Sequence, residues 1–146
     1  MGILLRVAVF LIAASWAHAA GVRPNIVFIL ADDLRYDALG SAGNPVLKTP
    51  NLDRLAARGT SFTRAFAPSP ICAISRASVL TGQYPRRHGV NDFGTQIADM
   101  SQTYPMLLQQ GGYYVGFIGK WGLDAANKGY FKRLAASFDF WGGSME

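Results

Sequence analysis

The chain has 146 residues, of which 50% are hydrophobic and 16% charged, and this composition excludes a disordered protein or a coiled coil. Its 16 glycines and 7 prolines follow no repeat, which excludes a collagen or a solenoid. The formal charge is +5 without a basic run, so we expect no nucleic-acid partner, whereas an anionic small molecule is compatible. One cysteine and two histidines cannot form a disulfide or a zinc-finger cluster, so a bound metal would be held mainly by oxygen.

The N-terminal residues have the pattern of an export signal. Arg6 precedes an apolar run over residues 7–14, and residues 17–19 have the small-x-small pattern of a cleavage site. The apolar run is shorter than the roughly 20 residues that a membrane-spanning helix needs. We therefore expect residues 1–19 to be a signal peptide, the protein to be periplasmic or extracellular, and no stable membrane insertion after cleavage.

The next segments alternate between strand and helix patterns. Residues 25–30 form a short β-rich apolar run, which predicts a central strand buried on both faces of a parallel sheet. A helix is predicted from the cap Thr49 to the stop signal Gly59, with its apolar face on the sheet. Residues 60–66 alternate enough to predict a second strand.

The remaining segments continue this alternation. Helices are predicted over residues 75–80 and 103–110, and a strand over 113–119. Residues 83–102 show little periodicity and predict a long connection, which in a compact domain is more often functional than idle. The order of elements predicts a layered α/β fold with mainly parallel strands and flanking helices.

Two adjacent carboxylates follow the first predicted strand, at the sheet edge where parallel sheets bind ligands. Asp32 and Asp33 repel each other unless a cation or hydrogen bonds offset their charge. Oxygen ligands suit Ca²⁺ or Mg²⁺, so the pair indicates a metal site. The alternative is a helix over residues 34–39 that Asp33 caps.

Other reactive side chains fall at the same predicted edge, where Lys120 follows the last strand and Cys72 lies on the loop after the second. Cys72 precedes a helix, whose exposed N–H groups favour an anion, and Arg76 adds a fork-shaped donor for a tetrahedral oxyanion. A thiol phosphatase would place five residues between cysteine and arginine, whereas three lie here. The alternatives are an inert buried Cys72 and, for His88, a locally bonded loop histidine.

The segment from Cys72 to Gly82 resembles the signature of the sulfatase family, in which cysteine, two residues, serine and arginine lead to Leu-Thr-Gly. Residues 23–33 resemble the family's opening strand with its metal-binding pair, and residues 49–56 resemble its next helix. Residues 84–90 resemble the segment after the cysteine helix. Residues 119–121 resemble the lysine motif, and residues 138–142 a later motif. The resemblance implies an alkaline-phosphatase-like fold. It also implies that residues 20–146 are the N-terminal part of a longer catalytic domain, truncated here and poorly folded alone.

The resemblance implies a particular chemistry for Cys72. In sulfatases a separate formylglycine-generating enzyme oxidises this cysteine to formylglycine, whose aldehyde hydrates to a gem-diol. One hydroxyl attacks the sulfur of a sulfate ester and expels the alcohol, and loss of the remaining proton then expels sulfate and restores the aldehyde.

The resemblance also implies roles for the other candidates. Arg76 and Lys120 would neutralise the developing negative charge, and His88 would support the cysteine helix. The ligands of Ca²⁺, which is favoured over Mg²⁺, would be Asp32, Asp33 and the modified Cys72.

Two positions depart from the family pattern, and two alternative functions stay open. Ile74 stands where proline or alanine is usual, and Gly122 stands where histidine follows the lysine motif. We expect a sulfatase that acts on a sulfated carbohydrate or small molecule. The alternatives are a phosphomonoester or phosphodiester hydrolase of the same superfamily, which would have serine or threonine as its nucleophile, and a non-catalytic sulfatase fragment.

Overall fold

The computed structural model describes residues 23–123 and 128–144, and the expected signal peptide at 1–19 lies outside them. The chain divides into two compact units, one ending at Leu34 and the other beginning at Arg35, and each is described by itself. Within the described residues, no helix combines the length and the apolar character that crossing a membrane requires.

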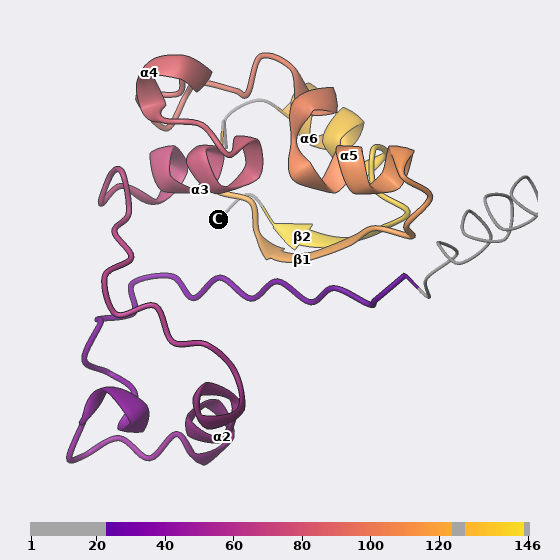
Figure 1. The fold of residues 1–146 in the computed structure, drawn as a ribbon. Helices are drawn as coiled ribbons and strands as arrows, with labels where there is room; N and C mark the ends of the chain where they lie inside the picture. The colour runs from indigo at the N-terminus through magenta and orange to yellow at the C-terminus, as the bar shows by residue number, and fades with distance from the viewer. Residues whose placement is uncertain (1–22, 124–127, 145–146) are drawn as a thin grey trace, which may run out of the picture. The chain divides into compact units, whose positions relative to one another are not determined.

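The described part of the first unit is an irregular chain rather than the predicted central strand (indigo in Figure 1). Its apolar side chains are exposed, with Val27 at 82% and Ile29 at 79%. A strand exists only through hydrogen bonds to a neighbouring strand. In the part of the chain that the structure describes, the sheet consists of β1 and β2 alone, so the prediction for residues 25–30 is wrong here.

The second unit begins with the 3₁₀ helix η1 (Gly40–Ala42) and helix α2 (Pro50–Arg58), which contact each other. The predicted bounds of α2 are confirmed, because proline favours the first turn of a helix and the chain turns away at the next glycine. The predicted burial of its apolar face is wrong, since Leu52 and Leu55 are exposed.

Thr49 also differs from its predicted role as a helix cap. Its hydroxyl accepts a hydrogen bond from the backbone N–H of Gly40 at 2.8 Å and donates to the Asp53 carboxylate at 2.8 Å. Thr49 and Asp53 therefore join α2 to η1 instead of capping the free N–H groups of α2.

Helix α3 (Cys72–Thr81) follows an irregular segment, and the short helix α4 (Pro85–His88) follows α3. The strand predicted over residues 60–66 is wrong, since Phe62 lies 79% exposed and the segment pairs with no described strand. The helix predicted over 75–80 is confirmed but longer, because Cys72 is its first residue rather than part of the preceding loop.

The rest of the unit supplies the sheet and its cover. The elements in chain order are η2 (Met100–Gln102), α5 (Tyr104–Gln110), β1 (Gly116–Lys120), α6 (Lys128–Ala135) and β2 (Phe140–Ser144). The bounds of α5 agree with the prediction, whereas β1 begins three residues later than predicted. The two strands are parallel, as the sequence predicts, and Lys120 lies opposite Ser144. The segment over 83–102, predicted as a long connection, contains the short helices α4 and η2, and its Val90 and Ile97 are buried in the core.

Helices lie beside the two strands of the sheet (Figure 1), and a cluster of aromatic side chains packs where they meet. Phe117 of β1 stacks on Trp141 of β2, with ring centroids 4.9 Å apart, and meets Trp121 edge-on at 5.3 Å. Trp121 is 1% exposed, and the core around it extends to α3 through Ala73 and Ala77, which are completely buried. Apolar burial is the main favourable contribution to folding, so this core fixes the position of α3 relative to the end of β1.

Candidate functional site

Cys72 occupies the N-terminal end of α3. The residue before it, Ile71, has an extended backbone and provides no side-chain cap for the helix. The first N–H groups of a helix have no partner within the helix and carry a partial positive charge. Cys72 is partly exposed and is not in a disulfide. The side chain of Cys72 therefore extends from the end of a helix that favours negative charge.

Arg76 joins the first turn of α3 to the end of β1. It lies four residues after Cys72, which places both residues on the same side of the helix. Its side chain is buried at 8% exposure, and its Nη1 donates a hydrogen bond of 2.7 Å to the backbone oxygen of Lys120. A buried guanidinium needs such partners, because burial of an unsatisfied charge is costly.

Lys120 and Arg76 approach each other at Gly122. A Cβ atom built on Gly122 would lie 3.0 Å from Cδ of Arg76 and 3.5 Å from Cε of Lys120. Gly122 has φ +74°, a left-handed conformation that favours glycine over a residue with a side chain. Two cationic side chains from different elements thus converge on one turn, an arrangement suited to binding an anion.

His88 is a buried residue at the end of α4, with 8% exposure. Its Nε2 lies 2.9 Å from the hydroxyl oxygen of Ser78 in α3, and its Nδ1 accepts a hydrogen bond of 3.1 Å from the backbone N–H of Val90. Burial lowers the pKa of His88 below its usual value of 6.5, because desolvation disfavours the charged ring. The imidazole is therefore neutral at pH 7 and linked to the cysteine helix.

Asp32 and Asp33 belong to the first unit, and both are exposed. Asp33 has φ +53°, the single positive φ of a non-glycine residue in the ranges that the structure describes. The alternative of a helix capped by Asp33 is not observed, because residues 34–39 are not helical. Across residues 23–123 and 128–144, no three histidine, cysteine or acidic side chains gather in a metal-binding cluster.

The second unit thus brings together part of the predicted set. Arg76 and Lys120 meet, Cys72 lies one turn from Arg76, and His88 contacts α3. Ser78, through which His88 makes this contact, was not predicted as a site residue. A serine within a helix most often donates a hydrogen bond to the preceding turn, as Ser78 does to the backbone oxygen of Ile74 at 3.0 Å, so no local pattern indicates its second partner.

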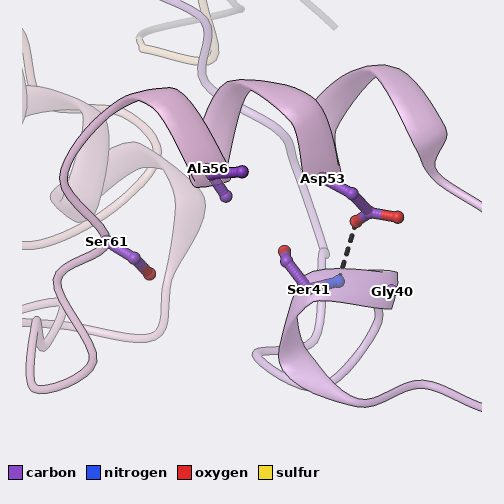
Figure 2. Close-up of a pocket in the computed structure, with 6 residues that line it drawn as sticks. Gly40, Ser41, Asp53, Ala56 and Ser61 are labelled. Atoms are coloured by element: carbon purple, nitrogen blue, oxygen red, sulfur yellow. Dashed lines mark hydrogen bonds between the residues drawn. The ribbon is translucent and has the colours of Figure 1, made fainter.

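A separate hollow of about 410 Å³ lies between η1 and α2. Figure 2 shows Asp53 facing Ser41 across it, with the carboxylate accepting the backbone N–H of Ser41 at 2.7 Å. The lining residues are Gly40, Ser41, Asp53, Ala56, Ala57 and Ser61. None of the predicted site residues lines this hollow, and its carboxylate serves to close the turn between η1 and α2.

Comparison with known families gives a match over most of the chain. The family model described as Sulfatase matches residues 24–145. This range includes every candidate site residue and every described helix and strand.

Similar proteins of known name agree with this match. The chain is 38% identical to the N-acetylgalactosamine-6-sulfatase of Homo sapiens, over 88% of the chain and 27% of that protein. It is 38% identical to the N-acetylglucosamine-6-O-sulfatase of Bacteroides thetaiotaomicron, over 74% of the chain and 19% of that protein. It is 39% identical to the ulvan-active sulfatase of Formosa agariphila, over 82% of the chain and 24% of that protein. The chain therefore spans about a fifth to a quarter of the length of the curated relatives it matches.

A substitution at Gly122 tests its close approach to Arg76. Gly122→Ala should destabilise the protein by about 1–2 kcal/mol through left-handed strain and by about 1 kcal/mol more through the Cβ contact with Arg76. Gly89→Ala is the matched control, because Gly89 has φ +75° but open space around its Cβ position. Urea unfolding of both variants in the full-length protein measures the difference, and equal losses would contradict the close approach.

Proposed function

Because the chain belongs to the sulfatase family, we propose that the protein of which it forms part hydrolyses sulfuric esters. The family has an alkaline-phosphatase-like α/β fold, and the parallel pair of β1 and β2 with its helices agrees with that class. The observation that carries the proposal is the convergence of Arg76 and Lys120 one turn from Cys72. The arrangement supports the proposal, because two positive charges near Cys72 would stabilise negative charge that develops during attack on sulfur.

Cys72 is the residue that we propose is converted to formylglycine by a separate modifying enzyme. The hydrated aldehyde would supply the oxygen nucleophile for sulfur. The chain's own contribution is electrostatic, because the N-terminus of α3 and the guanidinium of Arg76 favour negative charge at this position. Lys120 adds a second positive charge from the end of β1, where it can stabilise a sulfate oxygen as charge develops.

Asp32 and Asp33 are the proposed ligands of Ca²⁺, together with the modified Cys72. Two adjacent carboxylates match the oxygen donors that Ca²⁺ binds, and Mg²⁺ is the less favoured ion. The left-handed backbone at Asp33 supports this proposal, because such conformations concentrate at ligand-binding positions. A bound divalent ion would add positive charge beside the sulfate group.

A sulfated carbohydrate is the proposed substrate class. Two of the relatives are named as 6-sulfatases of N-acetylgalactosamine and N-acetylglucosamine, and a third as ulvan-active. An exported location, as the N-terminal residues predict, would suit a polymeric or extracellular substrate.

Conversion and removal of Cys72 test the proposed activity in the full-length exported protein. Produced in cells that hold a formylglycine-generating enzyme, the peptide that carries Cys72 should have an aldehyde in place of the thiol by mass analysis. Cys72→Ala should lower turnover of an aryl sulfate by at least roughly 1000-fold, because it removes the nucleophile. Gln83→Ala, just beyond α3, is the control. An intact thiol in active protein would contradict the proposal.

Substitution of the carboxylate pair tests the metal site. Asp32→Asn and Asp33→Asn should each weaken Ca²⁺ binding in calorimetry by at least about tenfold, because a neutral amide replaces a charged ligand. Asp92→Asn is the matched control, since the Asp92 carboxylate is exposed and accepts hydrogen bonds from its own turn. Unchanged Ca²⁺ affinity in both variants would show that the pair does not hold the ion.

A further inference from the structure

A chain of three hydrogen bonds runs from the loop after α4 into α3. Val90 is completely buried, and its backbone N–H points to Nδ1 of His88. Because Nδ1 accepts this bond, the neutral ring carries its proton on Nε2. Nε2 then donates to the Ser78 hydroxyl, and that hydroxyl donates to the backbone oxygen of Ile74. Each of these three donors has an acceptor, so the geometry selects one tautomer of His88.

The contact between Ser78 and His88 holds the side of α3 opposite to Arg76. Successive residues of an α-helix are about 100° apart around its axis, so Ser78 lies about 200° from Arg76. Arg76 fastens one side of α3 to the end of β1, and Ser78 fastens the other side to α4. A helix held on two opposite sides cannot turn about its own axis without breaking one of the bonds.

Apolar packing and polar contacts both act on the rotation of α3. Ala73 and Ala77 are completely buried, and Ile74 and Leu80 are buried at 7% and 6% exposure. Apolar burial is non-directional, whereas the hydrogen bonds of Arg76 and Ser78 are directional and select one rotation of the helix. Burial of a serine and a histidine costs little free energy here because their polar atoms form hydrogen bonds with each other and with the backbone. If one partner is removed, the other stays buried without a hydrogen bond, which costs its full desolvation free energy.

We infer that Ser78 and His88 are positioning residues, which hold α3 so that Cys72 and Arg76 face Lys120. This inference rests on the proposed function. It gives Ser78 and His88 a role that needs no contact with the sulfate ester. The pair acts through the rotation of α3, and His88 acts as a neutral donor from Nε2 rather than as a proton carrier. A residue that only packs in the core needs no particular hydrogen-bond direction, whereas this positioning role requires that His88 donates from Nε2 and accepts at Nδ1.

Three variants of the full-length protein separate the two bonds of the ring. Ser78→Ala removes the acceptor in α3, and His88→Asn keeps an acceptor near Nδ1 but loses the Nε2 donor. His88→Gln keeps a donor near Nε2. In molecules whose Cys72 is fully modified, Ser78→Ala and His88→Asn should each lower kcat roughly tenfold, the rate equivalent of one lost hydrogen bond. KM should change less than about twofold, because the residues that bind substrate are retained.

The pattern among the variants carries the test. The double variant Ser78→Ala/His88→Asn should be no slower than either single variant, because both remove the same bond. His88→Gln should recover part of the loss seen in His88→Asn. Ser137→Ala is the matched control, since its hydroxyl also donates to the carbonyl four residues earlier but lies after α6 and is remote from His88 in sequence. Equal kcat in the wild type, Ser78→Ala and His88→Asn would overturn the inference.

A measurement on the wild-type protein separates failure of this inference from failure of the proposed function. In protein labelled with ¹⁵N-histidine, the nitrogen shifts of His88 should be those of the Nε2–H tautomer, and Ser78→Ala should move the Nε2 signal. A ring protonated on Nδ1 would overturn the inference even in an active enzyme. A modified wild-type protein that hydrolyses no sulfate ester would instead reject the proposed function, whatever the tautomer.

Discussion

The hydrogen bond from Arg76 to the backbone oxygen of Lys120 is the contact on which the candidate site depends. It links a helix that begins with Cys72 to the strand that ends with Lys120, across 44 residues of sequence. The bond requires close approach, and Gly122 permits it by adopting a left-handed conformation without a side chain. The hydrogen bond of Arg76 therefore holds α3 and the backbone of Lys120 together. Loss of the approach would separate the two positive charges that make the site attractive to an anion.

Burial and polar satisfaction work together around α3. The aromatic cluster of Phe117, Trp121 and Trp141 supplies non-directional apolar burial at the end of the strands. The polar contacts then select one orientation, because hydrogen bonds are directional and their buried atoms are costly to leave without partners. Ser78 and His88 belong to this second class of contact.

Helices α2 and α5 could be predicted closely from sequence, because each has proline in its first turn and glycine just after its last residue. Helix α3 has only the glycine signal and begins three residues before its predicted start, and the short α4 was not predicted although it has both signals. Most strands could not be predicted. Strand formation depends on a neighbour that a local pattern does not contain, so the apolar residues 25–30 gave a wrong prediction for the described structure. Strand β2 was missed for the opposite reason, because its glycines weaken the strand pattern while pairing with β1 stabilises it.

We propose that Arg76 and Lys120 together bind the sulfate group beside residue 72. A crystal structure of the full-length protein with inorganic sulfate would decide whether they do. We expect one sulfate with oxygens at about 3 Å from both the guanidinium of Arg76 and Nζ of Lys120, next to residue 72. A sulfate bound elsewhere, with neither side chain in contact, would contradict it.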